Sequence, residues 1–196
     1  FEAFTNEESQ LLISVLTNIR SLCNSADALK IISKYQSVVG TVIRCIHPED
    51  SKSFEIVLQI VLAYIFSPKA GSDKKYMEKL LKLVLSSIRS IKHGKRGWKL
   101  LGQIISASSK PKNILQALVP FLNGLNLVLQ DYPSYLHDFL HDINKSGFYE
   151  QLCTIPDDAH DGLAELKNYL ADESQMVNSL YPQTHLNLFN TKVVVN

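Results

Sequence analysis

Apolar residues recur three and four positions apart along most of this 196-residue chain, which is the spacing of one face of an α-helix. The clearest stripe of this kind comprises Met77, Leu80, Leu81, Val84, Leu85 and Ile88. Residues 54–66 are apolar on almost every side of a helix, so we expect neighbouring helices to enclose them and make them the most buried helix. Strands need an alternation of period two, which no segment shows convincingly. The pattern therefore predicts an all-α fold.

Turn-forming and helix-breaking residues divide the chain into about eight to ten helices. One helix is predicted from Ser25 to the break at Pro48, with a kink at Gly40. Residues 67–72 are rich in turn formers and predict a loop. After Pro156 the pattern predicts only a short helical stretch, from Leu163 to Leu170.

Many helices joined by short loops fit a stack of antiparallel helix pairs better than a four-helix bundle. The fixed sequence periods of ankyrin and tetratricopeptide arrays are missing from this chain. We therefore predict an irregular HEAT-like or MIF4G-like stack that forms a single domain over residues 5–180. Residues 181–196 have no helical period and are expected to form an irregular tail.

The composition limits the cellular compartments in which such a domain is expected. Hydrophobic residues make up 45% of the chain and charged residues 20%, as in packed globular proteins. The three cysteines are odd in number and form no C-x-x-C pair, which favours reduced thiols in the cytoplasm or nucleus. The apolar run of residues 54–66 is shorter than the ~20 residues that cross a bilayer, so no membrane span is expected.

The formal net charge of +1 hides an asymmetry between the two parts of the chain. Residues 1–112 hold 17 basic and 9 acidic residues, a net charge of +8, whereas residues 113–196 hold 3 and 10, a net charge of −7. Charge separation of this size can steer a partner of complementary charge. It is equally consistent with a solvated face on each half.

One pair of histidines resembles part of a metal site. His137 and His141 lie one helical turn apart with Asp138 beside the first, and His160 and Cys153 are the candidate third ligands of a metal-dependent hydrolase. We favour a solvated histidine pair, because no third ligand follows at a matching spacing. Sequences typical of nucleotide binding or acyl transfer are also missing. We therefore predict no catalytic residue, no metal and no cofactor.

Aromatic residues beside acidic ones form the first candidate binding site. Aromatic anchors supply buried area at protein interfaces while charges steer the encounter. The predicted protein-binding residues are Tyr132, Tyr135, Phe139, Phe148 and Tyr149. In the alternative interpretation the first three pack inward. Alanine at Phe148 or Tyr149 should weaken partner binding without destabilising the fold, unless these side chains also belong to the core.

A basic, glycine-containing loop forms the second candidate site. Its binding residues are Lys92, Lys95, Arg96, Trp98 and Lys99. Lysine and arginine here would contact an acidic protein segment or, weakly, RNA phosphates, with Trp98 stacking on a base. We favour the alternative in which the loop is solvated and Trp98 packs inward, because no further aromatic residues accompany it.

Three short pieces of the sequence carry a resemblance to a known family. They are Lys-Arg-Gly-Trp at 95–98, Asp-Tyr-Pro-Ser-Tyr-Leu-His-Asp-Phe at 131–139, and Cys-Thr-Ile-Pro at 153–156 followed by Leu-Lys-Asn at 166–168. Together they resemble the C-terminal homology domain of the large NOT scaffold subunit of the CCR-NOT deadenylase complex. Residues 141–147 look like an insertion relative to that family.

That resemblance implies a HEAT-like domain without catalytic residues. Such a domain docks other subunits and recruited repressors to a complex that carries out mRNA decay and translational repression. The residues and the resemblance thus agree on a non-catalytic scaffold that binds other protein subunits.

Overall fold

The structure is a computed structural model that describes residues 6–46, 50–91, 97–107 and 111–180. These residues form helices joined by turns, and no strand occurs among them, so the all-α prediction is confirmed. The helices are α1 Asn6–Cys23, α2 Ala26–Ile32, α3 Ser37–Arg44, α4 Ser51–Ile65, α5 Pro68–Ser72, α6 Lys74–Arg89, α7 Gly97–Ala107, α8 Pro111–Leu129, α9 Pro133–Lys145, α10 Phe148–Cys153, the short 3₁₀ helix η1 Asp157–Ala159 and α11 Leu163–Leu180.

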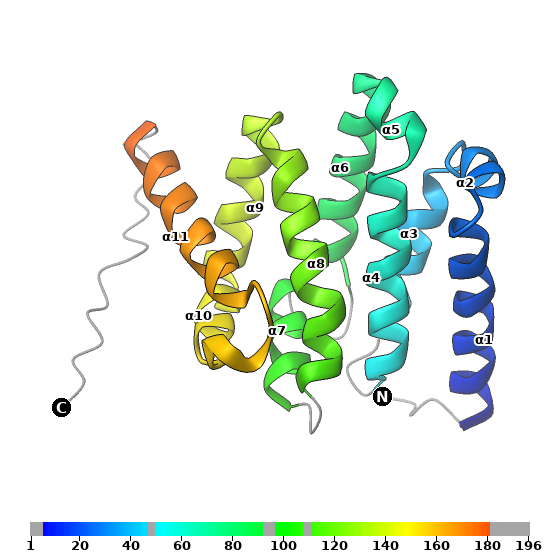
Figure 1. Cartoon of the computed structure of the whole chain (residues 1–196), viewed down its shortest axis with the longest axis horizontal. Coiled ribbons are helices and arrows are strands. Elements are labelled where there is room, and N and C mark those ends of the chain that lie inside the picture. Colours follow the sequence, from blue (N-terminus) through cyan, green and yellow to red (C-terminus); the bar gives the residue numbers. More distant parts are fainter. Residues whose placement is uncertain (1–5, 47–49, 92–96, 108–110, 181–196) are drawn as a thin grey trace.

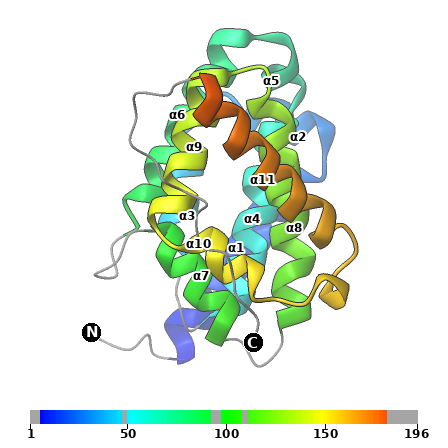
Figure 2. The same cartoon turned by 90° about the vertical axis from the view of Figure 1, so that its left-hand side faces the viewer.

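The helices lie in two layers (Figures 1 and 2). The first layer is a row in which α1 packs on α4, α4 on α8, and α8 on α11. The second layer holds α3, α6, α7, α9 and α10, again packed on their neighbours. Along the chain, α4 is followed in the second layer by α6, and α8 is followed there by α9. Each of these second-layer helices runs opposite to the first-layer helix before it (Figure 1). Apolar stripes from both layers meet between them and form one core.

Helix α4 lies in the middle of that core. Asp50 caps its first turn, because one carboxylate oxygen accepts hydrogen bonds from the backbone N–H groups of Lys52 and Ser53 at 3.0 Å. Nine of the fourteen side chains described in α4 are buried, but so are seven of the ten described in α7, so α4 is not more buried than every other helix. The stretch Lys52–Ser72 is long and apolar enough to span a membrane, longer than the run seen in the sequence. More than half of it is buried against other helices, as a core helix would be.

The helix predicted from Ser25 to Pro48 is in fact two helices, α2 and α3. The break falls at residues 33–36, where the Gln36 side chain donates a hydrogen bond to the backbone carbonyl of Tyr76, 2.8 Å away on α6. Gly40 does not kink the chain. It lies inside α3, and a Cβ atom there would stand 3.0 Å from the Ser87 hydroxyl of α6, so this glycine allows close helix packing.

Two further predictions about helix ends were wrong. Residues 67–72 form the short helix α5, because Ser67 caps its N-terminus and Pro68 occupies the first helical position. The same residue types favour turns and helix starts, so composition could not separate the two. Helix α11 extends beyond the short stretch ending at Leu170, as far as Leu180, where we expected the helical domain to end. The predicted irregular tail, residues 181–196, lies outside the described residues.

Candidate binding pocket between α6, α7 and α9

Three aromatic side chains hold the second layer together at one end. Trp98, in the first turn of α7, is only 2% exposed. Its ring packs edge-to-face against Phe139 of α9 and Phe148 of α10, with both centroid distances 5.4 Å. Pairs of this geometry add about 0.5 to 1.5 kcal/mol beyond the area they bury. The inward packing of Trp98 that we favoured from the sequence is therefore confirmed.

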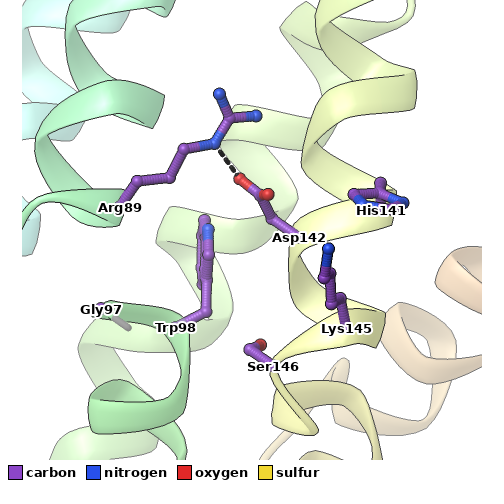
Figure 3. Close-up of a pocket in the computed structure, with 7 residues that line it drawn as sticks. All are labelled: Arg89, Gly97, Trp98, His141, Asp142, Lys145 and Ser146. Atoms are coloured by element: carbon purple, nitrogen blue, oxygen red, sulfur yellow. Dashed lines mark hydrogen bonds and ion pairs between the residues drawn. The ribbon is translucent and has the colours of Figure 1, made fainter. Parts of the chain in front are cut away.

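A pocket of about 260 Å³ opens beside Trp98 (Figure 3). It lies where the end of α6, the start of α7 and the C-terminal half of α9 meet. The residues that line it are Arg89, Gly97, Trp98, His141, Asp142, Lys145 and Ser146.

Gly97 makes this junction sterically possible. A Cβ atom at this position would lie 1.6 Å from the backbone carbonyl oxygen of Ile88, inside the last turn of α6. Only glycine lets α7 begin this close to α6, and this approach fixes where Trp98 enters the core.

One wall of the pocket is an ion-pair network between α6 and α9. The Arg89 Nε–H donates to the Asp142 carboxylate, and an Arg89 Nη atom lies 3.4 Å from a carboxylate oxygen of Asp138. Partial burial lowers the pKa of Arg89, but the two carboxylates together outweigh that effect and raise it. Arg89 therefore stays charged, and its charge is already compensated by two acids.

Two hydrogen-bond donors of the pocket, the Lys145 ammonium and the Trp98 indole N–H, take no part in this ion-pair network. Lys145 has no hydrogen-bond or ion-pair partner among the described residues. The indole nitrogen of Trp98 has no acceptor there either, and it is buried without accessible surface on the side of the ring toward the Arg89–Asp142 pair (Figure 3). Of these two donors, only the Lys145 ammonium is therefore open to a partner.

The hydroxyl and imidazole groups of the pocket are not arranged for nucleophilic catalysis. The Ser146 hydroxyl donates to the backbone carbonyl of Ile143 at 3.0 Å, and no described base accepts its proton. His141 stacks on His137, with ring centroids 6.5 Å apart. Within the part of the chain that the structure describes, no group of three His, Cys, Asp or Glu side chains could hold a metal ion. Neither Cys153 nor His160 joins the histidine pair as a third ligand.

The predicted aromatic binding site is divided between core and surface. Phe139 and Phe148 are fully buried, so their assignment as surface contacts was wrong. The physical reason is Trp98, against which both phenyl rings pack edge-to-face. Tyr149 is half-buried and donates to the backbone carbonyl of Lys167 at 3.3 Å, and desolvation followed by the nearby Cys153 raises its pKa.

Tyr132 and Tyr135 remain partly accessible, at the opposite end of α9 from the pocket. Their rings form an edge-to-face pair with centroids 6.5 Å apart. The Lys74 ammonium lies 5.8 Å from the centre of the Tyr132 ring, within the range of a cation–π contact. A second hollow, of about 440 Å³, lies between α5 and the turn that joins α8 to α9, and Tyr132 lines it.

The predicted basic binding residues also fall into separate groups in the structure. Lys92, Lys95 and Arg96 lie outside the described residues, while Lys99 is exposed on α7. Sequence reasoning missed Arg89 and Lys145. A signal for Arg89 was present, because it continues the row of Lys75, Lys79 and Lys82 on the face of α6 opposite its apolar stripe.

Comparisons of the chain with protein-family models, curated proteins and solved structures found no match.

Proposed function

We propose that this chain is a non-catalytic helical scaffold, built as a HEAT-like stack of antiparallel helix pairs, that binds another protein at the face containing the α6–α7–α9 pocket. The size of the pocket, about 260 Å³, carries this proposal. Sites for small molecules and cofactors usually measure about 300 to 1,000 Å³. A smaller pocket with a charged rim fits a single side chain of a protein partner, as binding hot spots do.

The positions of the resemblance motifs support a scaffold related to the NOT subunit. Trp98, from the first motif, packs on Phe139, from the second. Lys167 donates a hydrogen bond to the backbone carbonyl of Ile155 at 2.5 Å, which joins the two parts of the third. The shared residues therefore make the contacts that hold α7, α9 and α11 in place. On this basis we favour partners from an mRNA-decay complex in the cytoplasm or nucleus.

RNA binding is the weaker alternative. Base stacking was assigned to Trp98, which is buried between Phe139 and Phe148. Because the Trp98 ring is covered, single-stranded RNA could not gain from it the stacking contribution of about 1 to 3 kcal/mol per base. A protein partner needs no such platform.

The experiment compares two charge reversals in a capture assay. The immobilised wild-type chain, Lys145→Glu and Lys30→Glu are each incubated with nuclease-treated cell extract, and the retained proteins are identified by mass spectrometry. Lys30 is an exposed lysine on α2, at the opposite end of the molecule from α9. We expect a set of proteins that the wild type and Lys30→Glu retain and Lys145→Glu loses. The same retained proteins for all three chains would contradict binding at this face.

A further inference from the structure

We infer that α1 binds α1 of a second copy of this chain, in an antiparallel pair related by a two-fold axis. The contact is an exposed, mainly apolar line of side chains along the helix, Leu11, Val15, Asn18 and Leu22, named the α1 stripe. It lies where α1 ends the first layer, on the side opposite α11 (Figure 1). This contact goes beyond the binding face proposed above and does not depend on it.

Helix α1 is apolar over more of its circumference than the rest of the stack covers. Leu16 and Cys23 are buried in the core, whereas Leu11, Val15 and Leu22 are 67%, 47% and 48% exposed. Seven large hydrophobic side chains are exposed among the described residues, and five of them belong to α1, α2 or the turn after α2. Single exposed apolar residues are ordinary, but a group of them marks a contact surface. An end helix of a stack that meets only water carries a polar outer face instead.

The spacing of the α1 stripe is that of a coiled-coil seam. Its residues are separated by four, three and four positions, so they follow one line along the helix toward a partner helix. In an antiparallel pair centred between Leu16 and Thr17, Leu11 of each copy lies opposite Leu22 of the other. Val15 lies opposite Asn18 in the same way, because both pairs of positions have the same midpoint. The stripe is therefore complementary to itself.

Asn18 favours a second copy over an unrelated helix as the partner. Its amide lies within an otherwise apolar line, where a covered polar group without a hydrogen bond costs about 1 to 3 kcal/mol. In the antiparallel pair the two Asn18 residues flank the two-fold axis, about 4.5 Å apart along the helices. Each amide has a donor and an acceptor, so the two can bond to each other. A single asparagine in a coiled-coil seam fixes register and partner number in this way.

The charges at the two ends of α1 favour the antiparallel arrangement. The first turn carries Glu7 and Glu8, whereas residues 20–35, from the last turn of α1 through α2, hold three basic residues and one acidic residue. An antiparallel pair brings the acidic end of each copy to the basic end of the other, so both ends attract. A parallel pair would place like charges together.

The contact is small, so the dimer is expected to be weak. Each copy contributes three large apolar side chains to the α1 stripe. Interfaces that bury less than about 1,200 Å² are typical of transient complexes. We therefore expect a Kd on the order of tens of micromolar. At low micromolar concentration the chain is then a monomer with α1 uncovered.

Sedimentation velocity of the full chain at about 2 μM and about 200 μM tests the pairing. We expect the mass of one chain at the lower concentration and mainly that of two chains at the higher. Leu11→Glu and, separately, Leu22→Glu should each weaken dimerisation at least about tenfold, because each places a charge in the apolar seam. Leu127→Glu is the matched control, since Leu127 is 60% exposed on α8, and it should dimerise like the wild type.

Cross-linking tests the orientation in a Cys45→Ser, Cys153→Ser background, which removes the two cysteines that are not buried. One preparation then carries Leu11→Cys and a second carries Leu22→Cys. A disulfide forms only between residues whose backbones lie close together. Mild oxidation of an equal mixture should therefore give mainly the mixed dimer. Cross-linking of each preparation mainly to itself overturns the antiparallel pair.

A monomer at both concentrations, or dimerisation unchanged by the two glutamate variants, overturns the second copy as partner. Melting curves at low concentration show which variants are folded, and one folded glutamate variant is sufficient because both sites are exposed. A monomeric chain from which Leu11→Glu removes proteins in the capture assay also overturns it, and assigns the α1 stripe to a different protein. The capture assay with Lys145→Glu reports on the other face, so the proposed function stands or fails separately.

Discussion

Phe148 shows how much one side chain contributes to the site without touching a ligand. It is fully buried and packs edge-to-face on Trp98, at a centroid distance of 5.4 Å. Trp98 is held between this ring and Phe139, so the direction of its N–H group depends on both.

We expect Phe148→Ala to lower the free energy of unfolding by about 3 to 5 kcal/mol, because it removes a large buried ring and leaves a cavity. Urea denaturation followed by circular dichroism measures this loss. Tyr35→Ala is the control, since the Tyr35 side chain is 62% exposed and its removal should change stability little. Equal stability of the two variants would mean that Phe148 lies at the surface.

A buried tyrosine makes the stability of the chain depend on alkaline pH. The Tyr64 hydroxyl donates to the backbone carbonyl of Ile32 at 3.2 Å, and burial, with smaller effects of Cys23 and Tyr76, raises its pKa from 10.0 to about 12. The folded state therefore holds this proton more tightly than the unfolded state. The resulting contribution to stability is present below pH 10 and is lost as the pH rises from 10 to about 12.

Tyr64→Phe should reduce this alkaline loss of stability, because phenylalanine has no proton to release. Thermal melts at several pH values between 9 and 12 test it, with Tyr35→Phe as the matched control on an exposed ring. A pH dependence unchanged in Tyr64→Phe would show that other groups cause the loss.

At the scale of helices, the junction of α6 and α7 depends on one close contact. Gly97→Ala would place a methyl group 1.6 Å from the backbone oxygen of Ile88, which cannot move aside as a flexible side chain would. We expect a loss of about 1 to 3 kcal/mol or more in unfolding free energy, from strain in a packed core.

Gly71→Ala is the matched control for this prediction. No atom lies within 4 Å of a Cβ at Gly71, which is inside α5, so alanine there should stabilise the protein by roughly 0.5 to 1 kcal/mol. Chemical denaturation of both variants gives the comparison. If the two alanines have the same effect, the close approach of α7 to α6 is wrong.

The stripe of Met77 to Ile88 predicted its helix correctly, because α6 carries this apolar stripe within its own sequence. The break between α2 and α3 was missed because it depends on the hydrogen bond from Gln36 to Tyr76, a contact between separate helices. Helix α10 has only six residues, too few for a periodic pattern to identify its buried side. Contacts between separate helices also cannot be predicted from periodicity. The sequence therefore suggested the basic loop and α9 as two separate sites and did not show that Trp98 joins them.

At the scale of the whole molecule, the α1 end of the first layer is held differently from its middle. Helix α1 packs mainly on α2 and α4, and of its described residues only Leu16 and Cys23 are buried. Helices α4 and α8 pack on each other and on helices of both layers. In stacked helical proteins, stability is a sum of such contacts between neighbours.

We therefore expect local opening to begin at α1. In hydrogen exchange measured by mass spectrometry, amides of α1 should exchange faster than amides of α4 and α8, because opening α1 exposes less apolar surface. The order should persist when denaturant is added below the main transition. Uniform exchange across the three helices would indicate that the stack unfolds as one cooperative unit.

The row of helices in the first layer also has a mechanical consequence. A force that pulls the two ends of the row apart loads the contacts α1–α4, α4–α8 and α8–α11 in series. Elements in series yield in order of strength, and the α8–α11 contact is the least extensive of the three, so it gives way before the α4–α8 contact does. Tension transmitted along the chain would thus open the row at its α11 end first, while the contacts of α4 with α1 and α8 stay closed.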